Sequence, residues 1–355
     1  MPALRILGGV AAFSFFVFQI RRYGRREVSR LNLIISCMLC VTVVALAVSP
    51  SLFNPVFRTF NFQPPENRLE AEARTRLVFV LVVAVVILFA LYLRLQASAD
   101  TNERSIRLLV EALGQREFDW DRAATFPSGD RLVVVSPAYN EAENVAAVIA
   151  AMPEKVEGYH VIPVVVSDGS EDRTAEVARG AGALVVQLPI RRGGGLALRV
   201  GYDIALQLDA DIVVTMDADG QHLPEELPVM IAPILRGEAD YVNGSRLLGY
   251  FERESTIRHL GVHFFSRVVT ILTGQRVTDI SSGYRAARAD LLRHLVLEQD
   301  QFWTSEILIE ALRHRARITE VPITILARAG GKSKKPKSLK YGWNFSKVIL
   351  QTWLR

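Results

Sequence analysis

The chain has 355 residues, half of them hydrophobic, and carries a formal net charge of +5. Together with the positive mean hydropathy, this composition argues against an entirely water-soluble enzyme and favours membrane segments. The length allows one sizeable catalytic domain with additional elements. The basic excess makes the surface compatible with anionic lipid or phosphate ligands.

Three apolar runs within residues 1–95 predict a transmembrane region with helices over 4–20, 31–48 and 77–93. A bilayer core about 30 Å thick needs about 20 helical residues, or somewhat fewer where polar ends reach the interface. A signal peptide is the alternative for the first run. That run lacks a small-x-small cleavage site and arginines follow it, so an uncleaved span is preferred.

The distribution of positive charge predicts the orientation of these spans. Five arginines lie between residues 21 and 30, in the short loop after the first span. The positive-inside rule places that loop in the cytoplasm and the segment 49–76 outside. Everything from about residue 96 onward is therefore expected at the cytoplasmic face of the membrane.

Residues 96–130 predict a juxtamembrane amphipathic helix followed by a linker. Four apolar residues share one face of this helix: Ile106, Leu109, Val110 and Leu113. The Phe-Pro-Ser-Gly-Asp stretch at 126–130 then indicates a linker into a new domain.

From residue 131 the pattern changes to short strands that alternate with helices. Runs rich in β-branched residues predict buried strands over 132–136, 161–167, 184–187 and 212–216. Helices are expected between them over 140–152, 174–180 and 196–208. This alternation predicts an α/β fold with a doubly wound sheet, which binds ligands beyond the carboxyl ends of its strands.

The strongest chemical signal is the pair Asp217 and Asp219, directly after the fourth predicted strand. Two carboxylates one residue apart can converge on one divalent cation, and Mg²⁺ or Mn²⁺ takes oxygen ligands and bridges them to a diphosphate. Gln221 is a third candidate ligand through its carbonyl oxygen. The structural alternative is a solvated turn or an N-cap for a helix that begins at Pro224. Polar clusters at three other strand ends favour the metal site.

Six motifs occur in order along this domain: Val-Ser-Pro-Ala-Tyr-Asn-Glu (135–141), Ser-Asp-Gly-Ser-Glu-Asp-Arg-Thr (167–174), Asp-Ala-Asp-Gly-Gln-His (217–222), Val-Asn-Gly-Ser-Arg (242–246), Thr-Asp-Ile-Ser-Ser-Gly-Tyr-Arg (278–285) and Glu-Val-Pro-Ile (320–323). Their order and spacing resemble family 2 glycosyltransferases of the GT-A fold. Within that family the chain is most similar to dolichyl- or polyprenyl-phosphate mannose synthases. The resemblance covers about 131–340 and implies a GT-A domain with a doubly wound mixed sheet over 131–330.

The resemblance also implies a nucleotide-sugar site, formed by Pro137, Tyr139, Glu141, Val166, Asp168, Asp217, Ala218, Asp219, Arg246, Arg328 and Lys334. The first five would surround the nucleoside, the next three would hold metal and diphosphate, and the three basic residues would contact sugar or phosphate. Turn formation, packing, helix capping or solvation is the structural alternative for several of them.

One departure from the family pattern is visible. Many relatives carry a lysine where this chain has three glycines at 193–195. The phosphate contact from this loop then falls to Arg191, Arg192 or Arg199.

The acceptor site is predicted from the motif at 278–285. A polyprenyl phosphate is already an anion near neutral pH, so catalysis reduces to metal, positioning and cationic clamps. Ser282 and Arg285 are the candidates for binding the acceptor phosphate, and Arg285 is grouped with the metal-binding aspartates as catalytic. A structural brace between Arg285 and Asp279 is the alternative. Glu306 is interpreted as structural, capping a helix that runs to His314.

The last segment, 331–355, combines a basic tract with a predicted helix. Five lysines lie between 332 and 340, and four apolar residues then share a helical face: Tyr341, Phe345, Val348 and Ile349. This pattern is typical of an interfacial helix beside anionic headgroups. The alternative is a C-terminal helix that covers the sheet.

The resemblance implies an inverting transfer of a hexose, with mannose favoured, from GDP-mannose or a UDP-sugar to a polyprenyl or dolichyl phosphate. Expected partners are these substrates and membrane lipid, with no nucleic acid, and homo-oligomer formation is left open. A polysaccharide synthase is one alternative, but those enzymes usually carry Gln-x-x-Arg-Trp and more C-terminal spans. An inactive membrane scaffold is another, but it predicts decayed motifs, whereas the metal and nucleotide positions are intact.

Overall fold

The computed structural model describes residues 10, 13–21, 33–38, 40–41, 44, 68–251, 256–327 and 339–354. The chain divides into two compact units, Met1–Ser105 with Arg355, and Ile106–Leu354. Within the described ranges, no helix is both long and apolar enough to cross a membrane. The predicted spans are therefore not confirmed, and much of the first two lies outside the described residues.

The second unit is built on one eight-stranded sheet. Its strands are β1 (Arg131–Ala138), β2 (Lys155–Val156), β3 (Tyr159–Asp168), β4 (Leu184–Leu188), β5 (Ile212–Thr215), β6 (Tyr241–Phe251), β7 (Arg285–Arg288) and β8 (Ile318–Ile325). β1 pairs in parallel with β3 on one side and β5 on the other, and β4 extends this half in parallel from β3. These four are the strands that the β-branched runs predict.

The other half of the sheet makes it mixed. β7 runs antiparallel to both β5 and β6, and β8 pairs in parallel with β6. The strand order is β2-β3-β1-β5-β7-β6-β8, with β4 also on β3. The predicted α/β fold with a mixed sheet is confirmed.

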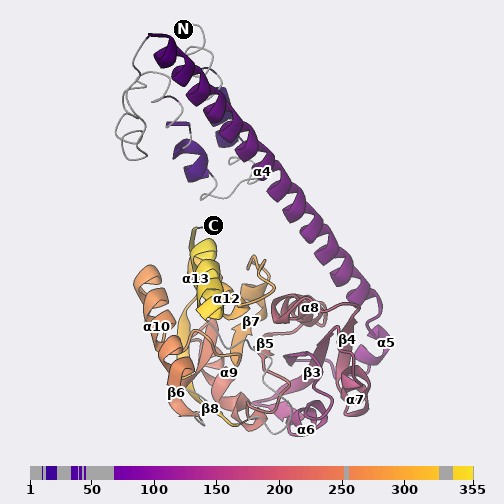
Figure 1. Ribbon diagram of the computed structural model, residues 1–355. Coiled ribbons are helices and arrows are strands. Elements are labelled where there is room, and N and C mark those ends of the chain that lie inside the picture. The colour runs from indigo at the N-terminus through magenta and orange to yellow at the C-terminus, as the bar shows by residue number, and fades with distance from the viewer. Residues whose placement is uncertain are drawn as a thin grey trace. The chain divides into compact units, whose positions relative to one another are not determined.

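Helices cover both faces of the sheet (Figure 1). The helices from residue 68 onward are α4 (Arg68–Arg116), α5 (Trp120–Ala123), α6 (Val145–Ala150), α7 (Thr174–Gly180), α8 (Gly194–Gln207), the 3₁₀ turn η2 (Pro224–Glu226), α9 (Leu227–Leu235), α10 (Thr256–Thr273), α11 (Ala289–Leu292), α12 (Trp303–Arg313) and α13 (Leu339–Leu354). Successive residues of β1 alternate between two buried clusters, Val133 and Val135 with α8, and Leu132 and Val134 with α9. This alternation buries both faces of the strand, as expected for a doubly wound sheet.

The end of α4 packs on the domain through the face that carries Val110. Val110 is buried, but Ile106, Leu109 and Leu113 are 44%, 63% and 45% exposed. The packed face includes Gly114, where an added Cβ would lie 2.7 Å from Leu188 Cδ2. Three of the four apolar residues therefore stay exposed, while charged residues near Val110 bind partners in the domain, as described below.

The C-terminal helix α13 packs inside the domain. Phe345 and Ile349 belong to the main buried cluster, and Val348 is 8% exposed. The ring of Phe345 makes edge contacts with Phe265 of α10 and with Phe302, at centroid distances of 4.7 and 5.4 Å. These apolar residues therefore fit the alternative of a helix that covers the domain, while the predicted basic tract before α13 lies mostly outside the described residues.

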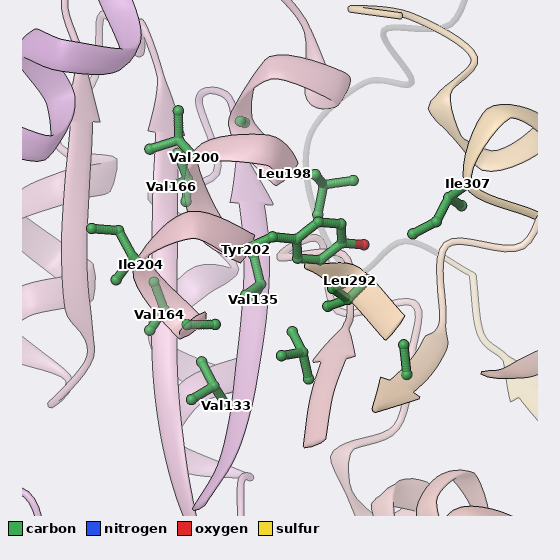
Figure 2. Packing of buried hydrophobic residues seen from close by; sticks show 14 of the residues in the cluster. Val133, Val135, Val164, Val166, Leu198, Val200, Tyr202, Ile204, Leu292 and Ile307 are labelled. Atoms are coloured by element: carbon green, nitrogen blue, oxygen red, sulfur yellow. The ribbon is translucent and has the colours of Figure 1, made fainter. Parts of the chain in front are cut away.

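The closest helix-to-sheet approach occurs where α8 crosses β1 and β3. Figure 2 shows Val135, Val166 and Tyr202 among the packed side chains of this core. At Gly201, an added Cβ would lie 2.2 Å from Val135 Cγ1 and 3.2 Å from Val166 Cγ2. Both valines are fully buried and stiff at χ1, so α8 reaches this depth only with glycine.

We expect Gly201→Ala to destabilise the domain, because the methyl group has no space and the neighbours cannot rotate away. Overpacking of this kind costs about 1–3 kcal/mol, which should lower the melting temperature by several degrees. Gly180→Ala in α7 is the matched control, since no atom lies within 4 Å of its added Cβ. Equal melting temperatures for the two variants would contradict the packing argument.

Candidate active site

The predicted site residues gather at one edge of the sheet because the parallel strands end there together. Ala138 at the end of β1 pairs with Ser167 of β3, and Val135 pairs with Thr215 of β5. The segments that follow β1, β3 and β5 therefore leave the sheet side by side. They carry the residues 137–141, Asp168 and 217–222.

The turn after β5 is held by its own polar side chains. The N–H of Asp217 donates to Nδ1 of His222 at 3.2 Å, and the N–H of Gln221 donates to Oδ1 of Asp219 at 3.2 Å. Gln221 also joins the turn to the residue just after β8. Its side-chain Nε2 donates to the carbonyl of Leu326 at 3.0 Å, and the N–H of Leu326 donates to the main-chain carbonyl of Gln221 at 2.9 Å. Both carboxylates are thus carried by a fixed turn.

A second turn lies directly against the first. An added Cβ at Gly283 would sit 2.7 Å from Oδ2 and 3.0 Å from Cγ of Asp217. Only glycine allows the main chain of this turn to touch the carboxylate. The sequence analysis assigned Gly283 no role, although its place in a Ser-Gly-Tyr-Arg motif marked the segment.

The donor set at this turn suits a hard divalent cation. Among the described residues, no group of three or more His, Cys, Asp and Glu side chains could hold a metal. Asp217 and Asp219 offer two carboxylates, and the side-chain amide of Gln221 adds an oxygen of the kind that Mg²⁺ takes as a ligand. Mg²⁺ typically binds one or two carboxylates plus substrate phosphates, so this small set fits a cation shared with a diphosphate.

Asp168 is tied to the loop before α8. Its carboxylate accepts hydrogen bonds from the N–H groups of Arg192 at 2.8 Å and Gly193 at 2.7 Å. Burial raises the pKa of Asp168 above its ordinary value, and these N–H groups oppose that rise. Gly193 has φ +115°, a backbone conformation that favours glycine. The backbone conformation at Gly193 therefore explains why a glycine stands in this loop, where many relatives carry a lysine.

The three candidate arginines of this region separate into two groups. Arg191 lies over the ring of Tyr139, with its guanidinium carbon 3.9 Å from the ring centroid. Arg192 and Arg199 instead bind the carboxylate of Asp300. The guanidinium of Arg191 thus lies beside a predicted nucleoside residue, whereas Arg192 reaches Asp168 through its main-chain N–H.

The remaining nucleoside residues differ in how far a ligand can reach them. Pro137 and Tyr139 are partly exposed, whereas Glu141 is buried and accepts a hydrogen bond from Nδ2 of Asn144 at 2.9 Å. Val166 is fully buried in the core (Figure 2). Its side chain faces α8, so the prediction that it lies beside the base is wrong for the side chain.

Asp219 is 9% exposed, and Ala218 between the two aspartates is buried. The backbone of this segment is therefore what a diphosphate would meet between the two carboxylates. Arg328 and Lys334 lie outside the described residues.

Arg246 is the partner of Asp279. Its Nε lies 2.6 Å from Oδ2 of Asp279, and its Nη2 donates to Oγ of Ser281 at 3.3 Å. Asp279 is completely buried, but the Arg246 side chain keeps 19% of its surface exposed. The guanidinium of Arg246 is therefore anchored on Asp279 while part of its side chain stays exposed to solvent.

Arg285 lies inside the domain instead. It is 1% exposed and donates to the carbonyls of Ser282, Ile280 and Thr304 and to the hydroxyl of Tyr241. Ser282 is also completely buried. Neither side chain is open to an acceptor phosphate, so the geometry favours the structural alternative. The partners differ from the predicted brace, because Asp279 binds Arg246.

Glu306 is structural, with a different partner from the predicted cap. It is fully buried, and its carboxylate accepts the N–H groups of Glu298 and Gln299 at 2.8 and 2.9 Å. It thereby holds the segment before α12, which itself begins at Trp303 and ends at Arg313.

We expect Arg285→Ala to lower the melting temperature strongly, because it leaves several buried acceptors without a donor. Hydrogen bonds to charged groups contribute about 1.5–3 kcal/mol each, and Arg285→Lys cannot replace the guanidinium geometry. Arg288→Ala, on the same strand with a 42% exposed side chain, is the control and should change stability less. An Arg285→Ala variant with an unchanged melting temperature would contradict the structural role.

Comparison with known proteins places this site in a family. The family model for glycosyl transferase family 2 matches residues 133–296. A dolichyl-phosphate hexose transferase of Haloferax volcanii is 33% identical over 228 residues, covering 64% of this chain and 97% of the relative. An undecaprenyl-phosphate mannosyltransferase of Micrococcus luteus is 33% identical over 215 residues, covering 58% and 87%.

The fold also matches a solved structure. Glucosyl-3-phosphoglycerate synthase from Mycobacterium tuberculosis, in complex with Mn²⁺, UDP and glucosyl-3-phosphoglycerate, is similar with a TM-score of 0.50 and 25% identity. The match covers 66% of this chain and 81% of that chain. The GT-A-like fold implied by the motifs is thus confirmed, and the chain belongs to glycosyl transferase family 2.

Proposed function

We propose that this glycosyltransferase moves a hexose from a nucleotide-sugar to a polyprenyl phosphate, with inversion at the anomeric carbon. The observation that carries the proposal is the pair Asp217 and Asp219 on a fixed turn at the carboxyl end of β5, against Gly283. The similarity to proteins named as dolichyl-phosphate and undecaprenyl-phosphate sugar transferases supports a lipid phosphate as the acceptor.

The chain's residues divide the work of such a transfer. A divalent cation held by Asp217, Asp219 and Gln221 would neutralise charge on the departing nucleoside diphosphate. Tyr139 with Arg191 above its ring forms a cationic wall where the nucleotide is expected. The acceptor phosphate is an anion and needs no general base, so the remaining task is to hold both substrates in line.

Arg246 is the described residue best placed to contact a sugar or phosphate from the acceptor side. Its guanidinium is anchored on Asp279 and partly exposed, which orients the charge without burying it. Arginine is suited to this task because its fork binds phosphate oxygens in pairs. Arg328 and Lys334 would add charge from the segment after β8.

The test is detection of lipid-linked product by thin-layer chromatography with a panel of labelled nucleotide-sugars, Mn²⁺ and a polyprenyl phosphate. GDP-mannose is the first donor because the Micrococcus luteus relative is named a mannosyltransferase. UDP-glucose is the second because the structural neighbour binds UDP. 3-Phosphoglycerate is the competing acceptor. Product on phosphoglycerate and none on lipid would contradict the proposal.

We expect Asp219→Asn to abolish transfer with little effect on the melting temperature. A neutral amide cannot replace the anionic ligand, but it matches the carboxylate in size and its oxygen can still accept the N–H of Gln221. Asp290→Asn is the matched control, because this carboxylate is 95% exposed and lies outside the site. Near-normal turnover of Asp219→Asn with Mg²⁺ or Mn²⁺ supplied would refute the metal site.

We further propose that the chain is an integral membrane protein whose catalytic domain faces the cytoplasm, as the apolar runs and the arginine loop predict. In a background without Cys37 and Cys40, Gln63→Cys should react with an impermeant thiol reagent added outside intact cells. Ser128→Cys, on the exposed linker, should react only after the cells are opened. The reverse labelling pattern would refute this topology.

A further inference from the structure

Asp300 lies among three arginines that come from three different parts of the domain. Its carboxylate is 3.5 Å from Nε of Arg107 in α4 and 3.0 Å from Nη2 of Arg192 in the loop before α8. It also binds Nη2 of Arg199 in α8. All four side chains are less than 20% exposed, so water screens these contacts weakly.

The main chain at Asp300 also contacts the glycine turn at the start of α8. The carbonyl of Asp300 accepts the N–H of Gly195 at 2.9 Å. Added Cβ atoms at Gly193 and Gly195 would lie 2.6 Å from the Asp300 carbonyl and 1.9 Å from that of Gln299. The carboxylate of Glu306 holds the 298–299 segment by accepting its two main-chain N–H groups. The main chain at 299–300 therefore packs directly against the glycine turn at 193–195.

The loop that Asp300 holds is the loop that shapes the nucleotide end of the site. Arg192 binds Asp300 through its guanidinium and Asp168 through its N–H. Gly193, the next residue, gives Asp168 its second hydrogen bond. Arg191, the preceding residue, lies over Tyr139. Asp300 therefore contacts the loop whose three consecutive residues, 191–193, lie at the predicted nucleoside pocket.

We propose that Asp300 is a positioning residue for the nucleotide-sugar: through Arg192 it holds the 191–193 loop against Asp168 and Tyr139. Asp300 itself lies in the segment before α12 and touches neither the metal-binding turn nor Arg246 in any contact described above. Its loss should weaken nucleotide binding while leaving the reacting groups in place. The inference rests on the proposed function in one respect, that the ligand of this pocket is a nucleoside diphosphate.

The test measures binding of UDP and of GDP, each with Mn²⁺, by calorimetry on the full-length protein. For the nucleotide that the unmodified protein binds, Asp300→Asn should raise Kd at least about fivefold, the lower end of typical coupling between sites. Arg192→Met should act in the same direction, and the double variant should add little to Asp300→Asn, because both substitutions remove the Asp300–Arg192 ion pair. KM for the nucleotide-sugar should rise while kcat at saturation changes little.

Arg107→Met is the matched control. It removes an arginine from the same carboxylate, but from α4, and leaves the Arg192 contact in place. Its nucleotide Kd should stay within about twofold of the unmodified protein. A loss of affinity in Arg107→Met equal to that of Asp300→Asn would overturn the proposal, because the effect would then come from general loosening of the domain.

Two further outcomes separate the claims. An unchanged Kd in both Asp300→Asn and Arg192→Met, with binding intact in the unmodified protein, overturns the positioning role alone. Failure of the unmodified protein to bind either UDP or GDP overturns the proposed function and the positioning role with it. If Asp300→Asn unfolds, as its melting temperature will show, Arg192→Met carries the test by itself.

Discussion

A buried arginine, Arg285, holds the turn that lies against the carboxylate of Asp217. Arg285 donates to three carbonyls and a hydroxyl inside the domain, and two of those carbonyls, at Ile280 and Ser282, belong to the turn just before it. That turn carries Gly283, whose main chain touches the carboxylate of Asp217. A buried guanidinium is stable only where its donors are satisfied, so this network holds the turn at 280–283 beside the proposed metal-binding turn after β5.

The nucleotide end of the site is built in a similar way. Asp168, at the end of β3, accepts two main-chain N–H groups from the 191–193 loop. The ion pair between Arg192 and Asp300 in turn holds that loop. At both ends glycine allows a close approach, at Gly283 to the Asp217 carboxylate and at Gly193 to the main-chain carbonyl of Asp300. The residues expected to contact substrate, such as Asp217 and Arg191, therefore lie on turns. Other residues, such as Arg285 and Asp300, hold those turns in position.

Prediction from sequence succeeded where the signal is local. The four parallel strands are continuous β-branched runs, and the Asp-x-Asp pair follows one of them directly, so both were visible without long-range information. Which face of an element packs is a long-range property. Arg285 and Val166 were assigned to ligands although both are buried, and the packed face of α4 includes Arg107 because Asp300, far along the chain, offers it a charge. No local pattern carries that pairing.

The most direct test of this account is the effect of Gly283→Ala on Mn²⁺-dependent binding of UDP or GDP, measured by calorimetric titration. The added methyl group would displace the Asp217 carboxylate, so the part of the affinity that depends on Mn²⁺ should be lost while the fold is retained. Gly261→Ala in α10, whose added Cβ meets no atom within 4 Å, should bind as the unmodified protein does. Unchanged Mn²⁺-dependent affinity in a folded Gly283→Ala variant would contradict the account.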